Sequence, residues 1–330
     1  MGNPDHPPLP SDPREVWQGG FLTPSQPVSA VSAGAGLIVG GGSSLFMVRP
    51  AGEQILSRPL PPAIGPIVAV AAEPWAPHRF AIAARGRISI FEGERPEEPV
   101  LEASMSNSAV DATHLAWVRE KGEVALYFRT RGKNLGRIWV DRPAQEFLEA
   151  PPLNAVASDA SGRLAMICDG SNYMEVMLAK ADGSGFDVRE PTMIFDDDAD
   201  PDVHVYLAVH GDSVAYSVKE WGSGVSWSPD QRDFEPTTSL YGGPIAFQDA
   251  ETLFGAYCVD TNGSIFRETR DGRVTRVADI EAEGGDDAQV NILSLAWDPS
   301  RRVLWGASPE CGLLQSREPL RPGERKIVLS

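Results

Sequence analysis

The chain has 330 residues, of which 42% are hydrophobic and 23% charged, and its formal net charge is −17 at pH 7. A chain of this length can bury a large core. The negative charge argues against a nucleic-acid partner and against an anionic membrane surface, because both are bound through clustered Lys and Arg.

Residues 1–27 are rich in proline and have neither the cationic start nor the apolar segment of a signal peptide. We expect them to form an extended arm over the folded domain, in which residues 16–22 can supply a strand. No stretch of the sequence approaches the ~18 apolar residues of a membrane helix. These features predict a cytoplasmic protein, in which the three cysteines are reduced thiols.

Residues 28–330 repeat one pattern seven times: an apolar run, a polar turn, a second apolar run, a tight turn and one or two further strands. Units of this kind cannot bury an apolar face alone and must stack on their neighbours. The first turns of successive units are 38 to 51 residues apart, which is typical of four-stranded propeller blades. These turns lie near Gly34, Trp75, Lys121, Ala160, Gly211, Asp249 and Pro299.

The apolar runs have the period of strands. Aliphatic residues alternate with others in segments 87–91, 123–128 and 203–209. No window of eleven or more residues has a helical apolar stripe, and 32 Gly and 28 Pro disfavour helices. We predict an all-β chain that forms a single seven-bladed β-propeller of four-stranded blades. Strands from the two chain ends, within residues 16–22 and 326–329, are the candidates for closing the ring.

Catalytic motifs are missing from the sequence. It has no nucleophile elbow, phosphate-binding loop, zinc-protease motif or Cys-x-x-Cys pair. The five histidines are dispersed, and even His204 and His210, on one strand face, would be ~20 Å apart. We therefore predict no catalytic residue, no cofactor and no bound metal.

Two acidic segments fall at connections between units, so both should emerge on the same rim of the disc. Such segments are commonly solvated loops, and alternating carboxylates also occur in calcium loops, although the helix–loop–helix spacing is missing here. We favour them as a patch that contacts the basic surface of a protein partner. The patch residues are Asp196, Asp197, Asp198 and Asp200 before the fifth unit, and Glu281, Glu283, Asp286 and Asp287 before the seventh.

The fifth unit carries two tryptophans, Trp221 and Trp227, in a Gly/Ser-rich hairpin. A tryptophan in such a hairpin either covers the edge of a blade or anchors a partner at the surface. Covering a blade edge is the commoner of these two roles, and we include both residues in the predicted partner-binding patch.

The seven units, with their Ser158–Arg163 and Trp297–Arg301 turns, resemble the WD40-like propeller superfamily over residues 28–330. The Gly-His and Trp-Asp series of true WD40 repeats is absent, so its hydrogen-bonded tetrad is not implied. As a small acidic propeller without enzyme motifs, the chain also looks like the propeller components of bacterial MoxR ATPase and von Willebrand A systems. This resemblance implies a non-enzymatic scaffold in a multi-protein bacterial assembly.

An alternative resemblance comes from residues 257–267 and the Asp271–Val274 turn, which are similar to blades of gluconolactonase-like propellers. Those proteins are metal-dependent hydrolases, and the resemblance implies Asp260 and Asn262 as ligands of a divalent cation. That family is six-bladed, and no matching glutamate is found near the first unit. The mouth of the central channel should discriminate the two interpretations, because an enzyme needs several converging oxygen ligands there.

Overall fold

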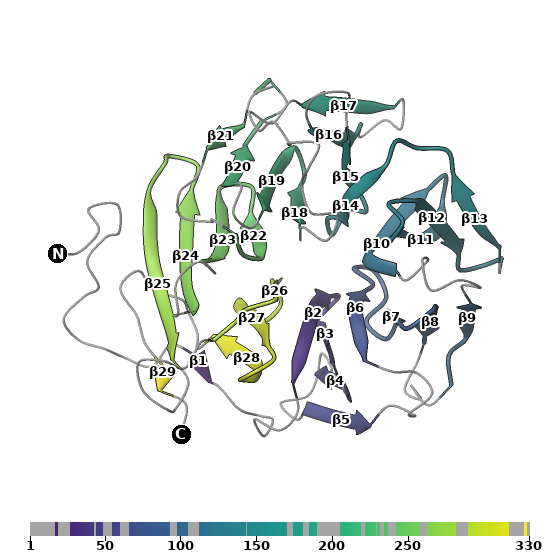
Figure 1. Ribbon diagram of the computed structural model, residues 1–330, viewed down its shortest axis with the longest axis horizontal. Coiled ribbons are helices and arrows are strands. Elements are labelled where there is room, and N and C mark those ends of the chain that lie inside the picture. Colours follow the sequence, from purple (N-terminus) through teal and green to yellow (C-terminus); the bar gives the residue numbers. More distant parts are fainter. Residues whose placement is uncertain are drawn as a thin grey trace.

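Seven small β-sheets stand around a central axis, and the chain visits them in order (Figure 1). The predicted all-β, seven-bladed propeller is confirmed. Among the described residues, no helix is long and apolar enough to cross a membrane. The computed structural model describes residues 17–18, 27–42, 44–48, 55–59, 66–92, 98–104, 112–142, 144–169, 174–180, 185–189, 205–218, 222–228, 230–231, 234–236, 242–257, 263–281, 290–316 and 327–328.

In the first four blades, consecutive strands pair antiparallel, from an innermost first strand to a fourth strand at the outer edge. Blade one contains β2 (Val28–Gly34), β3 (Leu37–Gly42), β4 (Ser44–Val48) and β5 (Ile55–Pro59). Blade two contains β6 (Ile67–Ala72), β7 (Phe80–Ala84), β8 (Arg87–Phe91) and β9 (Leu101–Ser104). Blade three contains β10 (Ala112–Glu120), β11 (Glu123–Thr130), β12 (Leu135–Trp139) and β13 (Gln145–Leu148). Blade four contains β14 (Leu153–Ser158), β15 (Leu164–Asp169), β16 (Met174–Ala179) and β17 (Phe186–Arg189).

The last three blades repeat this order, and strands from the chain ends join two of them. Blade five contains β18 (Val205–His210), β19 (Ser213–Val218), β20 (Gly222–Ser226) and β21 (Glu235–Pro236). Blade six contains β22 (Ile245–Asp249), β23 (Thr252–Tyr257), β24 (Gly263–Thr269), β25 (Val274–Glu281) and the C-terminal β29 (Ile327–Val328). Blade seven contains β26 (Ser294–Asp298), β27 (Val303–Ser308), β28 (Gly312–Ser316) and the N-terminal β1 (Trp17–Gln18).

The ring is closed by the N-terminal strand. In β1, Trp17 pairs with Ser316 and Gln18 with Gln315, so the outer strand of the last blade comes from the start of the chain. The expectation that residues 326–329 also close the ring is wrong. Because β1 occupies the free edge of β28, β29 instead pairs in parallel with β25, as a fifth strand of blade six.

The sequence periodicity located the strands well. Segment 87–91 coincides with β8, segment 123–128 lies within β11, and β18 begins two residues after the start of segment 203–209. All seven turns near which the repeats were aligned lie at the connection between the first and second strand of a blade. Local turn chemistry and alternation are sufficient for this, because both act over a few residues.

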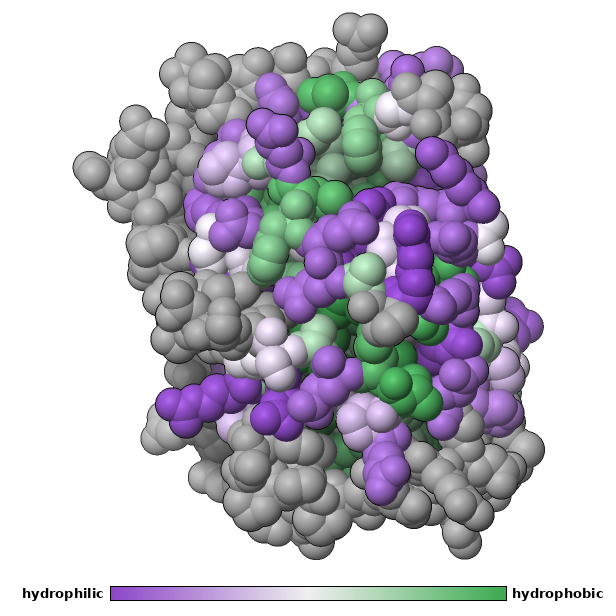
Figure 2. Space-filling model, turned by 90° about the vertical axis from the view of Figure 1, so that its right-hand side faces the viewer, coloured by the Kyte–Doolittle hydropathy of each residue, from purple (hydrophilic) through white to green (hydrophobic). Residues whose placement is uncertain are grey.

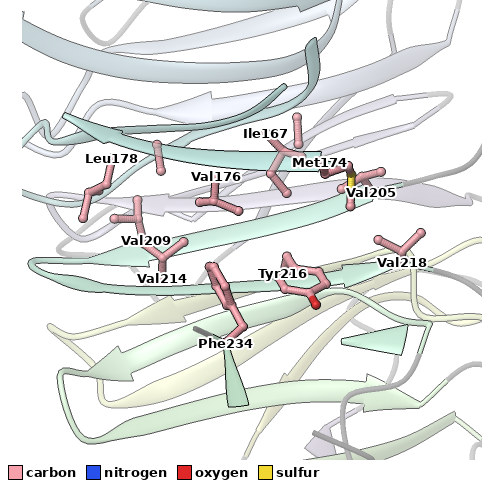
Figure 3. Packing of buried hydrophobic residues seen from close by; sticks show 12 residues of the cluster. Ile167, Met174, Val176, Leu178, Val205, Val209, Val214, Tyr216, Val218 and Phe234 are labelled. Carbon is pink, nitrogen blue, oxygen red and sulfur yellow. The ribbon is translucent and has the colours of Figure 1, made fainter. Parts of the chain in front are cut away.

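The core is divided into seven apolar clusters, one between each pair of neighbouring blades. Between blades four and five, Val176 and Leu178 face Val209, Val214 and Tyr216 (Figure 3). Burying each such side chain contributes about 1.5–3 kcal/mol. Each blade therefore buries its apolar faces against the two neighbouring blades, as the repeat pattern predicts.

Candidate functional site

The innermost strands of all seven blades enclose a central channel with a volume of about 1590 Å³. Its wall combines small apolar residues with hydroxyl, amide and aromatic groups. Among the lining residues that the structure describes, Asp159 is the one carboxylate, and it is buried. Polar or aromatic lining residues include Ser29, Ser32, Thr113, His114, Tyr206, His210, Gln248, Ser294 and Trp297.

Both oxygens of the Asp159 carboxylate accept hydrogen bonds. Its Oδ1 accepts from the amide of Ser161 at 2.8 Å, the hydroxyl of Ser161 at 2.6 Å and the amide of Arg163 at 3.0 Å. Its Oδ2 accepts from the amide of Gly211, in the next blade, at 2.8 Å. This carboxylate holds its own turn and fastens blade four to blade five, so it is not poised to bind a cation in the channel.

A second aspartate performs the same task between blades seven and one. The carboxylate of Asp298 accepts from the amide and the hydroxyl of Ser300 at 2.9 and 2.6 Å, and from the guanidinium of Arg301 at 2.6 Å. Arg301 also donates to the carbonyl of Gly36 in blade one at 2.8 Å. The two turns singled out in the sequence are thus blade-to-blade clamps at one end of the channel.

Trp75 bridges three blades at this same end. Its indole Nε1 donates to the carbonyl of Ala160 at 2.9 Å, which joins blade two to blade four. The guanidinium of Arg119, from blade three, lies 4.3 Å from the centre of the indole ring. Gly162 packs beneath the ring, where a Cβ would come within 2.6 Å of it. Sequence reasoning missed this bridge, because the two hydrogen-bonded residues are 85 positions apart.

His114 is held on both ring nitrogens. Nε2 lies 3.1 Å from the carbonyl of Val205 in blade five, and Nδ1 lies 3.1 Å from the hydroxyl of Thr113. Arg129 donates to that hydroxyl at 2.8 Å and to the carbonyl of Leu153 at 2.9 Å. This network ties blade three to blades four and five beside the channel, which gives His114 a structural role.

Most of the predicted partner-binding residues lie outside the described residues. The first acidic segment falls between β17 and β18, and the second between β25 and β26, so both occupy blade-to-blade connections. Glu281 ends β25 and pairs with Val328 through the backbone, and its side chain is not described. Asp196, Asp197, Asp198, Asp200, Trp221, Glu283, Asp286 and Asp287 lie outside the described residues.

Trp227 is part of the core. Its side chain is 5% exposed and meets the ring of Phe247 edge to face, with 5.9 Å between centroids. Both belong to the cluster between blades five and six. Of the two interpretations of Trp227, the packing role is the one observed, because the hairpin directs the indole inward between blades.

No group of three or more His, Cys, Asp or Glu side chains that could hold a metal ion occurs in the described part of the chain. The ligands suggested by the lactonase resemblance, Asp260 and Asn262, lie outside it. Cys168 and Cys311 are free and buried, and burial raises the pKa of the Cys168 thiol to about 12 and that of Cys311 to about 11.

The fold and its channel define the class: a seven-bladed β-propeller, and solved structures share this fold. A chain of the mitotic checkpoint complex is similar over 96% of this chain and 98% of that one (TM-score 0.65, 14% identity). U3-55K is similar over 91% and 98% (TM-score 0.66, 10% identity). PorZ, a surface component of the type-IX secretion system of Porphyromonas gingivalis, is similar over 93% of this chain and 39% of its own (TM-score 0.57, 13% identity). No family model and no curated protein matches the sequence.

Proposed function

We propose that this protein is a non-enzymatic scaffold that binds protein partners in a cytoplasmic bacterial assembly. The proposal rests on two observations: the polar groups beside the channel link the blades to one another, and large apolar side chains are exposed to solvent. Asp159, His114 and Arg129 beside the channel are engaged in holding blades together. Large apolar side chains are exposed at two places: Val68 in the channel, and Val100, Phe147, Phe186 and Val188 in or beside the outer strands of three consecutive blades, where they are available to partners.

Two structural neighbours support a role in a protein assembly, because each is itself part of one. One is a chain of the mitotic checkpoint complex, and PorZ is a component of a secretion system. No comparison carries the more specific resemblance to the propellers of MoxR ATPase systems, so the identity of the assembly stays a prediction. Nothing in the described residues favours the lactonase alternative.

The acidic segments at the two blade-to-blade connections remain our proposed contact for a basic partner surface. This part of the proposal rests on charge and position in the sequence: seven of the eight carboxylates fall between a fourth strand and the next first strand. Loops at such connections are where a propeller presents residues for recognition. The net charge of −17 supports a protein partner rather than a nucleic acid or a membrane.

The test is purification of the tagged full chain from its native cells, followed by binding kinetics with the captured protein. The triple variant Asp196→Asn, Asp197→Asn, Asp198→Asn should slow association about tenfold at low salt and flatten its salt dependence. Neutralising three exposed carboxylates at turns of the opposite end, Asp212, Glu251 and Asp271, is the matched control and should leave association unchanged. A chain that captures no stoichiometric partner, but holds a divalent metal and hydrolyses lactones, would overturn the proposal.

A further inference from the structure

Most of the polar side chains in the channel wall are already bonded to neighbouring blades. The hydroxyl of Ser29 donates to the carbonyl of Ile67 at 2.9 Å, and that of Ser294 donates to the carbonyl of Val31 at 3.1 Å. A buried water needs about two to four polar partners, so this part of the wall is poorly suited to hold ordered water. The other lining side chains with protein hydrogen-bond partners include Ser32, Thr113, His114 and Asp159.

The channel wall also carries little charge, although the net charge of the chain is −17. Its described lining residues include no Lys or Arg, and Asp159, the one carboxylate, accepts four hydrogen bonds from protein donors. At the channel end formed by the turns, Arg119 lies on the Trp75 ring and Arg301 is bonded to Asp298. A charged ligand would lose its hydration here without gaining an opposite charge, so the wall favours an uncharged one.

Val68 is the large apolar side chain of the wall that stays exposed, at 47%. Blades one to four each have a β-bulge at the second residue of the innermost strand. In blades one, three and four this residue is Ser29, Thr113 or Asn154, and each forms a side-chain hydrogen bond. In blade two it is Val68. An exposed valine, where neighbouring blades place a bonded polar group, indicates contact with a ligand.

The other end of the channel has polar groups without protein partners. The innermost strands run in one direction along the channel, so Ser158 and His210, which end β14 and β18, lie far from Val68. Gln248 lies at the bulge of β22, near the same end. These three side chains line the channel, and none forms a hydrogen bond with another described residue. Val68 is the second residue of a six-residue strand, which places it about 13 Å from this end at about 3.3 Å per residue.

We propose that the channel binds an uncharged amphiphile. Its apolar chain lies against Val68 and the small apolar residues of the wall, and its hydroxyl or amide group bonds to Ser158, His210 and Gln248. The channel volume of about 1590 Å³ exceeds the roughly 300–1,000 Å³ of common small-molecule sites, so the ligand fills part of it. Burial of the chain in a poorly hydrated apolar channel drives binding. This inference goes beyond the proposed function and does not depend on it.

Displacement of an uncharged fluorescent probe, N-phenyl-1-naphthylamine, from the full-length protein tests the ligand class. The alcohol 1-decanol, whose extended chain spans the distance from Val68 to Gln248, should displace the probe saturably. Decanoate and decylammonium have the same chain but carry a charge, and should be at least about tenfold weaker. The shorter 1-octanol should be about tenfold weaker than 1-decanol, because it buries two fewer methylene groups.

Two valines of blade two locate the site. Val68→Asn should weaken binding of 1-decanol at least about fivefold. Val100→Asn is the matched control, since Val100 is 55% exposed but directly precedes β9 on the outside of the disc. Figure 2 views the side of the disc on which β9 lies, and it shows apolar patches set between strongly polar side chains.

Two further variants test the fit of the ligand. Val68→Trp, which narrows the channel and keeps its wall apolar, should also weaken binding of 1-decanol. Gln248→Leu should weaken it about fivefold, because the hydroxyl of the ligand loses a hydrogen-bond partner. Thermal unfolding of each variant shows that the fold is retained.

Absence of saturable displacement by 1-decanol, equal displacement by decanoate and decylammonium, or equal losses in the Val68→Asn and Val100→Asn variants would each overturn the inference. These outcomes differ from a failure of the proposed function. A chain that captures a stoichiometric partner but binds no 1-decanol would leave the scaffold function standing and show that the channel assignment is wrong.

Discussion

Aspartates stabilise the turns between the first and second strands of several blades. The number of hydrogen bonds that each carboxylate accepts differs from blade to blade. Asp298 is fully buried and accepts from the backbone, a hydroxyl and a guanidinium. Asp249, at the corresponding turn of blade six, accepts from the amide of Glu251 at 2.9 Å and is only partly buried. Side chains at equivalent turns therefore contribute unequally to stability.

We expect Asp298→Ala to lower the free energy of unfolding by about 3 kcal/mol, because it leaves buried donors and the Arg301 guanidinium without their acceptor. Asp249→Ala should cost less than about 1 kcal/mol. Urea unfolding measures both. Similar losses in the two variants would contradict the assignment of Asp298 as a clamp.

The buried thiols give a prediction about pH. With Cys258 replaced by Ser, neither Cys168 nor Cys311 should react with Ellman's reagent at pH 8 in the folded protein, and both should react in guanidinium chloride. The pKa values of about 12 and 11 exceed the unfolded value of 9.0. The stabilisation from these protonated thiols is therefore complete below pH 9 and is lost as the pH rises from 9 toward 12. Rapid reaction at pH 8 would show that the thiols are accessible.

In blades three and five, an aromatic ring of the second strand packs over a glycine of the third strand. In blade three, the ring of Phe128 lies over Gly136, to which it is paired, and meets Phe147 edge to face. In blade five, Tyr216 lies over Gly224 in the same register and meets Phe234 edge to face at 5.0 Å. Glycine is needed in the third strand because a Cβ there would overlap the ring of the second strand.

Gly136→Ala should therefore lower the free energy of unfolding by about 3 kcal/mol through overpacking against the buried Phe128. Gly211→Ala is the control: a Cβ there meets no atom within 4 Å, and its φ of +58° should cost only about 1 kcal/mol. The melting temperatures of the two variants, measured by calorimetry, give the difference in stability. A Gly136→Ala protein as stable as the Gly211→Ala protein would contradict the need for glycine beneath Phe128.

The strands and turns were predictable where the signal is local. The segment 87–91 alternates, and the turn residues near Ala160 and Pro299 use side-chain bonds to their own backbone. The burial of Trp227 and the exposure of Phe186 were not predictable, because both depend on how a neighbouring blade is placed. The Trp75–Ala160 bridge depends on three blades at once. The alternation of apolar residues shows which side chains share a face of a strand. It does not show which of these faces remains exposed to solvent once the blades are packed together.

For the whole molecule, the two chain ends have unequal roles. Deleting residues 1–22 removes β1 and leaves blade seven with three strands and an open edge at β28. Deleting residues 322–330 removes β29 but leaves blade six its four strands. We expect the N-terminal deletion to lower the melting temperature by more than about 5 °C and the C-terminal deletion by clearly less. A larger loss from the C-terminal deletion would contradict closure by β1.

The most direct test of the central claim, that this propeller is a platform for protein partners, is cross-linking mass spectrometry of the full chain with the protein it captures from its own cells. We predict a stoichiometric partner, with cross-links that gather on the outer strands of blades two to four and on the acidic blade-to-blade connections. A purified chain without any stoichiometric partner would contradict the claim, as would cross-links spread evenly over the disc.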